Sequence, residues 1–262
     1  MRFVILTFAI SWAFWVPQAL LARGIIESVW LSDLLASRWN VAPYGPTIAA
    51  VLIVLVNRGP LGLADFLWGG LAQRFSPYLL LPAVFLMPAL CWLALYLTPQ
   101  VGSALAIPVA SIPAVAVSMA LTSGPLQEEF GWRGFAQPRA QGRMPGVVAA
   151  ATVGVVWALW HLPLHFATGD EGPQYSAAIA MLVGNIVNMV FLAILIGWLY
   201  NATRGSVLAA MLMHASHNIA AFVLFPVFAT PEALPFYTLI MALAAVVAVL
   251  VGGPGRLGRQ RS

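Results

Sequence analysis

The stretch SAAIAMLVGNIVNMVFLAILIGWLY at residues 176–200 contains no charged side chain in 25 residues. About 20 consecutive apolar residues in a helix are enough to cross the hydrocarbon core of a bilayer, which is roughly 30 Å thick. Of the whole chain of 262 residues, 61% are hydrophobic and only 8% are charged, whereas soluble globular proteins carry about 25% charged residues. The sequence therefore predicts a protein that is largely embedded in a bilayer.

Seven more apolar stretches are separated by short segments rich in proline, glycine and charge. They cover residues 2–22, 41–57, 77–97, 107–138, 146–166, 205–226 and 233–252. We therefore expect an all-α polytopic membrane protein of about eight transmembrane helices that forms one domain over residues 1–262. Residues 59–75 are too short and too polar to span, and they place Leu63, Phe66 and Leu67 on one helical face. This pattern predicts an amphipathic helix at the membrane interface.

Positive charge is carried by twelve arginines and no lysine. They are spread singly between the apolar stretches, so nucleic-acid binding is not expected. With eight helices, and leaving out Arg133 inside the fourth, one side of the membrane would hold Arg2, Arg58, Arg74, Arg139, Arg143, Arg204, Arg256, Arg259 and Arg261. The other side would hold Arg23 and Arg38. Because positive residues concentrate on the cytoplasmic side, we predict a multi-pass cell-membrane protein with both termini in the cytoplasm.

An ionisable group inside the bilayer is costly unless it is paired, hydrated or bound, and the first such cluster is QEEFGWRG at residues 127–134. Glu129 and Arg133 are four residues apart and share a helix face, whereas Glu128 points elsewhere. An arginine that extends to the headgroups at a helix end would explain Arg133, but not two adjacent carboxylates. We expect Arg133 to neutralise one carboxylate. The other would be solvated, protonated, or engaged with a metal ion or water, as suits a general base.

The second polar group lies in WALWHLPLH at residues 157–165, where His161 follows Trp157 by one helical turn. A lone histidine on an aromatic face is commonly a packed residue bonded to a backbone carbonyl, but membrane depth favours a functional role. His165 follows Pro163 near the outer end of the stretch. We interpret His165 as interfacial, with a His-x-x-x-His zinc pair as the alternative.

The third polar group is HASHN at residues 214–218, where His214 and Asn218 are four residues apart and share a helix face. Neutral imidazole and amide groups bind a divalent metal or hold a water without adding charge. Hydrogen bonding between helices is the alternative role for Asn218. His217 is either a partner of these two residues or faces another helix.

Three patterns follow one another on successive membrane helices: Glu-Glu-x-x-x-Arg, aromatic-x-x-x-His and His-x-x-x-Asn. In this order they resemble the three motifs of the CAAX endopeptidase type II and bacteriocin-processing family. The resemblance covers about residues 124–220, within a core of residues 107–226 that carries the motifs. Trp157 departs from the family pattern, which usually has phenylalanine at this position. An aromatic packing role survives that exchange.

The resemblance implies an intramembrane endopeptidase that hydrolyses peptide bonds of membrane-associated peptides or proteins. By the same resemblance, Glu128 would be the catalytic carboxylate, and Glu129 and Arg133 would be its supporting pair. His161, His214 and Asn218 would line the same polar cavity inside the membrane.

Two reaction schemes are compatible with these residues. In the first, Glu128 and His161 take a proton from water while His214 and Asn218 stabilise the oxyanion. In the second, Glu128, His161 and His214 hold a divalent ion, most simply zinc, which activates the water. In the second scheme Glu128 cannot easily be both ligand and base, so Glu129 would have to take over one of the two roles.

The depths of these residues pose a geometric problem. By helical rise, His161 lies roughly 22 Å from the cytoplasmic start of its stretch, whereas Glu128 is expected nearer the cytoplasmic end of its own. Tilted helices or a deep, water-filled cavity are needed to bring the two residues together.

Two other classes of function are open. A carrier or channel could use the same residues to relay protons or bind ions, but such carriers often show internal repeats, and none is visible in the sequence. A non-catalytic immunity or scaffold protein could keep the fold without cleavage. Prenylation of the substrate is also left open, because the arginine-only, alanine-rich composition indicates a GC-rich bacterial source, where prenylated proteins are not expected.

Overall fold

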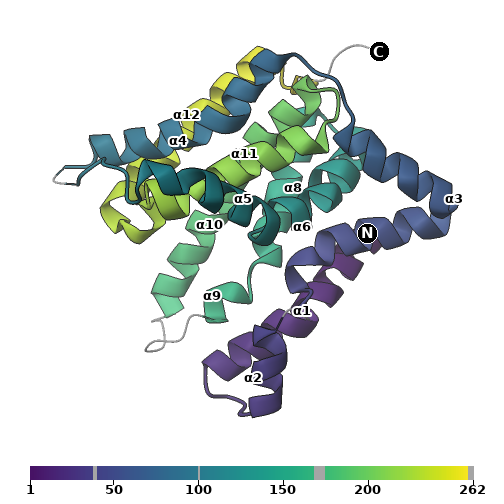
Figure 1. The fold of residues 1–262 in the computed structure, drawn as a ribbon, viewed down its shortest axis with the longest axis horizontal. Coiled ribbons are helices and arrows are strands. Elements are labelled where there is room, and N and C mark those ends of the chain that lie inside the picture. Colours follow the sequence, from purple (N-terminus) through teal and green to yellow (C-terminus); the bar gives the residue numbers. More distant parts are fainter. Residues whose placement is uncertain (38–39, 100, 168–174, 259–262) are drawn as a thin grey trace.

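The computed structural model describes residues 1–37, 40–99, 101–167 and 175–258, and within those ranges it contains helices and no strand (Figure 1). The α-helices are α1 (Arg2–Ala22), α2 (Val29–Ala36), α3 (Gly45–Leu71), α4 (Leu80–Leu97), α5 (Ile112–Thr122), α6 (Pro125–Glu129), α7 (Gln137–Gln141), α8 (Gly146–Trp160), α9 (Leu164–Ala167), α10 (Tyr175–Ala202), α11 (Val207–Ile219) and α12 (Leu234–Gly252). Two π-helical stretches, Phe130–Ala136 and Ala220–Leu224, continue α6 and α11.

Eight stretches of the described residues are long and apolar enough to cross a bilayer. They are Arg2–Ala22, Ala42–Leu71, Pro77–Leu97, Val109–Gln141, Gly146–Phe166, Leu182–Ala202, Val207–Leu224 and Pro231–Gly252. Each contains or overlaps one of the eight predicted spans. The expected all-α polytopic fold is therefore confirmed.

The fourth span is not one continuous helix, contrary to the expectation for residues 107–138. α5 ends at Thr122, and a new helical segment begins at Pro125 and runs through the π-helical stretch to Gln141. Gly124 at the break has φ = +107°, a backbone conformation that side chains disfavour and glycine accepts. The glutamate pair therefore lies at the start of a helical segment and not near its end.

The second span and the predicted amphipathic helix form one element, α3, with a kink between them. Gly59 has φ = +67° inside α3 and Pro60 follows it, and Figure 1 shows the sharp bend. The part after the kink ends at Leu71, a few residues before the predicted end at 75. Its position at the membrane interface stays a prediction.

A short helix that the hydropathy pattern does not predict, α2, lies between the first two spans. Ser28 caps it, because its Oγ accepts a hydrogen bond of 3.2 Å from the Leu31 N–H, and serine is a preferred residue at this position. Val29 and Trp30 at its start are 80% and 71% exposed. α2 therefore presents apolar side chains outside the helix bundle.

α11 lies at the centre of the molecule. Its span is 72% buried, against 22% for the span of α1, and it packs against α4, α5 and α10. α10 packs in turn against α8 and α12, with a close approach at Gly154, where a Cβ would lie 2.7 Å from the Val190 Cα. Polar side chains on α11 are therefore shielded from lipid by neighbouring helices.

Four arginines segregate to the two ends of α1, as the eight-helix count predicts for them. Arg2, Arg139 and Arg143 line one surface hollow, and Arg74 and Arg204 line another. Arg23, beyond the other end of α1, donates a hydrogen bond of 3.0 Å from Nε to the Phe166 carbonyl. We call the end of α1 at Arg2, where Arg139 and Arg143 also lie, the arginine-rich end; Arg38, Arg259 and Arg261 lie outside the described residues.

Candidate active site

A cavity of about 370 Å³ lies between α6, α8, α10 and α11. Seven residues singled out in the sequence line it: Glu128, Trp157, His161, His165, His214, His217 and Asn218. The three motifs therefore meet around one space, as the family resemblance implies. Glu129 and Arg133 lie behind this wall and are fully buried.

The break at Gly124 removes the mismatch in depth between Glu128 and His161. The segment that begins at Pro125 ends at Gln141, so Glu128 lies about 20 Å from that end. His161 lies roughly 22 Å from the start of α8, which begins five residues after Gln141. The two segments form a helical hairpin, and the two residues are level with each other because they are equally far from its turn.

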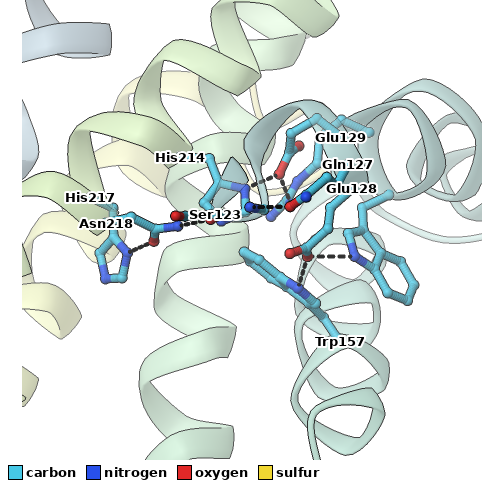
Figure 2. Close-up of polar contacts among 11 residues, drawn as sticks. Ser123, Gln127, Glu128, Glu129, Trp157, His214, His217 and Asn218 are labelled. Carbon is cyan, nitrogen blue, oxygen red and sulfur yellow. Dashed lines mark hydrogen bonds and ion pairs between the residues drawn. The ribbon is translucent and has the colours of Figure 1, made fainter. Parts of the chain in front are cut away.

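The Glu128 carboxylate is held by two indole rings. Its Oε2 accepts hydrogen bonds from Trp157 Nε1 at 2.6 Å and from Trp132 Nε1 at 3.2 Å, and Figure 2 shows the carboxylate directed at Trp157. Only 4% of Glu128 is exposed. Two donors on one oxygen fix the side chain and leave Oε1 turned toward Gly124.

Glu129 connects Arg133 to His214. Its Oε1 accepts a hydrogen bond of 2.8 Å from Arg133 Nη1 and another of 2.8 Å from His214 Nδ1 (Figure 2). The expected pairing of Glu129 with Arg133 is present. The guanidinium carbon of Arg133 also lies 4.5 Å from the centroid of the Trp157 ring, so one cation supports both the Glu129 carboxylate and the indole that holds Glu128.

Gly124 keeps open a small region between Glu128 and His214. A Cβ at this position would lie 2.6 Å from Glu128 Oε1 and 3.2 Å from His214 Nε2. Glu128 Oε1 and His214 Nε2 are therefore less than about 6 Å apart beside Gly124. One water molecule that hydrogen-bonds to both atoms can bridge a separation of this size.

The tautomers of the two cavity histidines follow from their partners. His161 Nδ1 lies 3.0 Å from the Trp157 carbonyl oxygen, which can only accept, so Nδ1 carries the hydrogen. His214 Nδ1 donates to the Glu129 carboxylate in the same way. In their neutral forms both rings therefore present Nε2 as a hydrogen-bond acceptor.

Asn218 is oriented by a chain of hydrogen bonds that reaches α12. Its Nδ2 donates to the Ser123 carbonyl at 2.6 Å, and its Oδ1 accepts from His217 Nδ1 at 3.0 Å (Figure 2). His217 Nε2 lies 2.9 Å from the hydroxyl of Tyr237, which is fully buried. His217 is therefore the partner that positions Asn218.

The zinc site considered from the sequence does not fit this arrangement. A catalytic zinc needs three converging protein ligands, and no three His, Cys, Asp or Glu side chains come together as such a group in the part of the chain that the structure describes. Nε2 of His161 and of His214 is available, because Nδ1 of each ring makes the hydrogen bond. Glu128 Oε2 is engaged by two indoles, which leaves Oε1 as its remaining oxygen, and these groups do not converge as a metal site among the described residues. His165 lines the same cavity as His161, and its interfacial position stays a prediction; the alternative His161–His165 zinc pair is not completed by a third ligand in the part of the chain that the structure describes.

Three contributions at the site were missed by the sequence interpretation. Trp157 was expected only to pack, yet it donates the shorter hydrogen bond to Glu128. Trp132 and Tyr237 were not given roles. Trp132 is four residues after Glu128 and could have been found from helical spacing, whereas Tyr237 is on a separate helix and carries no signal in the sequence.

Two comparisons with known proteins agree with the motif resemblance. Residues 110–220 match the model of a family described as type II CAAX prenyl endopeptidase Rce1-like. The chain is also 25% identical over 234 residues to a protein of Methanococcus maripaludis named CAAX prenyl protease 2, and the match covers 81% of this chain and 80% of that protein. All the residues discussed above from Ser123 to Asn218 fall inside the matched region of the family model.

Proposed function

From the membership of this chain in the CAAX endopeptidase type II and bacteriocin-processing family, which makes it a CAAX-type intramembrane protease, we infer that Glu128 is the base that activates the hydrolytic water. The observation that carries this proposal is the open region at Gly124, which both Glu128 Oε1 and His214 Nε2 can reach. A carboxylate and an imidazole that share one water are a suitable pair for general-base catalysis.

In the proposed reaction, a water donates one hydrogen to Glu128 Oε1 and the other to His214 Nε2. Its oxygen attacks the carbonyl carbon of the scissile peptide bond as Glu128 takes the first proton. His161, which lines the same cavity, shares that proton through a hydrogen bond. When the C–N bond breaks, Glu128 returns the proton to the leaving amine. The atoms of the water are then divided between the new carboxylic acid and the amine, and the Glu128 carboxylate is restored.

Asn218 stabilises the oxyanion in this scheme. Its amide nitrogen uses one hydrogen on the Ser123 carbonyl and carries a second, and the side chain lines the cavity. The proposal differs from the first sequence-based scheme because neutral His214 presents an acceptor and therefore orients the water. No metal ion takes part in the proposed reaction, because the described side chains do not form a three-ligand site.

The substrate that we propose is a peptide segment of a membrane-associated protein. The cavity is within the helix bundle, and α10 and α11, which line it, belong to stretches able to span a bilayer. The name of the archaeal relative refers to CAAX prenyl proteins. For this chain we propose the wider class, with or without a prenyl group.

Cleavage of a quenched fluorescent peptide library by the purified protein in nanodiscs tests this function. We expect the wild type to cleave the library both with and without a chelator. The variants Glu128→Ala and His214→Ala should not cleave it. Loss of cleavage on chelation, with recovery on adding zinc, would contradict the metal-free scheme. Normal cleavage by Glu128→Ala would contradict the role of Glu128, and thermal unfolding of each variant controls for folding.

We also propose that the arginine-rich end faces the cytoplasm, with both termini on that side. The segregation of the arginines supports this orientation. Single cysteines at Arg143 and Arg23, introduced with Cys91→Ala, should differ in their reaction with an impermeant thiol reagent added to intact cells. Only the cysteine at position 23 is expected to react, and the reverse result would invert the topology.

A further inference from the structure

The part of the cavity lining that belongs to α10 carries two asparagines that none of the three motifs includes. Asn185, Asn188, Met189 and Leu192 line the cavity from α10, and their spacing places them on one face of that helix. The rest of the 25-residue stretch around them is almost entirely apolar. Two amides on the cavity face of such a helix are costly unless they are used.

The amide of Asn188 has a fixed orientation. Its Nδ2 donates to the Gly184 carbonyl at 3.0 Å and to Thr238 Oγ1 at 3.1 Å. Because the carbonyl of Gly184 can only accept, nitrogen and oxygen cannot be exchanged. Asn188 Oδ1 is therefore an acceptor of known position, and it is buried without a partner in the structure.

Asn185 contributes the complementary group. Its Nδ2 is a buried donor without a partner, one turn before Asn188 on the same face. A buried polar atom that makes no hydrogen bond destabilises a fold, so native proteins rarely leave one unpaired. The cavity therefore offers one donor and one acceptor that a bound molecule can satisfy.

We propose that Asn185 and Asn188 form a subsite that binds the backbone of the substrate peptide; this inference rests on the proposed protease function. Asn185 Nδ2 donates to a peptide carbonyl, and Asn188 Oδ1 accepts a peptide N–H. A peptide backbone carries this complementary pair at every residue, and proteins that bind extended peptides obtain affinity from such main-chain hydrogen bonds.

The remaining cavity lining defines the side chains of the bound segment. Leu164, Met189, Leu192, Phe222 and Phe228 line the cavity together with the two asparagines. An extended segment bonded to α10 would place its side chains against these apolar groups. The predicted ligand is thus an extended peptide with apolar side chains, held between α10 and the residues that carry out the reaction.

Peptides with one ester in place of an amide test the inference, because an ester removes a single N–H donor. We expect one ester position to raise the KM of the wild type about tenfold with little change in kcat. In Asn188→Leu, the amide peptide should already show that higher KM, and the ester should add nothing. Asn57→Leu is the matched control, since Asn57 is an exposed asparagine on α3 outside the cavity, and it should behave as the wild type.

Binding to a non-cleaving variant separates this inference from the reaction itself. Fluorescently labelled amide and ester peptides are titrated into Glu128→Gln with and without Asn188→Leu, so that affinity is measured when no cleavage occurs. An ester penalty that disappears with Asn188→Leu supports the subsite even if the role of Glu128 is wrong. Equal affinities in all four combinations, with every variant folded by thermal unfolding, would overturn the subsite and leave water as the partner of the two asparagines.

Discussion

The two walls of the cavity differ in how their polar groups are held. On one wall, which we call the catalytic wall (Glu128, His161, His214 and Asn218), each side chain is oriented by a hydrogen bond to α5, α6, α8 or a neighbouring residue. On the α10 wall (Asn185, Asn188, Met189 and Leu192), a donor and an acceptor have no partner. The groups proposed to perform the reaction are thus held by hydrogen bonds within the protein, whereas those proposed to bind the substrate still have unpaired atoms.

Changes to the catalytic wall should therefore lower kcat, and changes to the α10 wall should raise KM.

The largest effect is expected from Glu128→Gln. The amide keeps the shape of the side chain but cannot take a proton from water, so kcat should fall by about 10³-fold or more. Turnover of a cleavable peptide in nanodiscs measures this loss. Unchanged peptide affinity would show that the binding wall is intact, and residual activity near the wild type would exclude Glu128 as the base.

Gly124→Ala should lower kcat by about 10²-fold, since the added methyl group would enter the region between Glu128 Oε1 and His214 Nε2 and displace the water. The positive φ of Gly124 adds backbone strain. Gly102→Ala is the control, because a Cβ there meets no atom within 4 Å and φ is not in the positive range. The water site would be refuted by a Gly124→Ala protein that unfolds at the wild-type temperature and turns over normally.

Trp157→Phe should lower kcat about tenfold. It removes the 2.6 Å hydrogen bond to Glu128, and a hydrogen bond to a charged group contributes about 1.5–3 kcal/mol. The ring that packs against Arg133 is kept. Measured kcat and KM distinguish this effect from general damage, because loss of the donor should lower kcat and leave KM near the wild-type value, whereas a packing defect in the cavity wall should change both.

Tyr237→Phe should lower kcat roughly threefold to tenfold through Asn218. The hydroxyl that bonds His217 Nε2 is removed, so His217 holds Asn218 less firmly. His217→Ala should give at least as large a loss. If the losses of kcat in the two single variants multiply in the double variant, Tyr237 and His217 act independently. The hydrogen bonds from Tyr237 to Asn218 would then not act as one connected chain.

The smallest effect is expected on the α10 wall from Thr238→Val. Thr238 Oγ1 is one of two groups that fix the Asn188 amide, and the Gly184 carbonyl remains after the substitution. KM should rise about two- to threefold with kcat unchanged. A fall in kcat instead would mean that the two walls do not act separately.

The sequence predicts the number of membrane spans and the motif residues because both depend on local patterns. Charge-free stretches of about 20 residues specify spans, and the four-residue spacing of Glu129 and Arg133 specifies their ion pair. The segregation of the arginines follows from the same count. These features require no knowledge of which helices are neighbours.

Features that depend on the neighbours of each helix could not be predicted from the sequence. The break at Gly124 is an exception: one long span was expected, although the dipeptide Gly124-Pro125 is typical of turns and could have indicated the break. The hydrogen bond from Trp157 to Glu128 joins residues 29 positions apart, and that of His217 with Tyr237 joins residues on α11 and α12. Polar pairing between helices is set by their packing, and hydropathy carries no information about it.

The π-helical stretch Phe130–Ala136, which follows Glu129 directly, has a consequence for alignment with relatives. A wide turn of this kind accommodates one residue more than an α-helix of the same length, and such turns are frequent at functional sites. A homologue with a regular helix here would have one residue fewer, and its alignment gap should fall between Glu129 and Gln137. Deleting a single codon in that interval should therefore leave a regular helix in which Gln137, whose Nε2 bonds the Gly197 carbonyl, keeps its facing, whereas a deletion within the regular helix α8 would rotate the residues beyond it by about 100° around the helix axis. The extra residue of the π-helical turn can thus be recognised in aligned sequences of relatives.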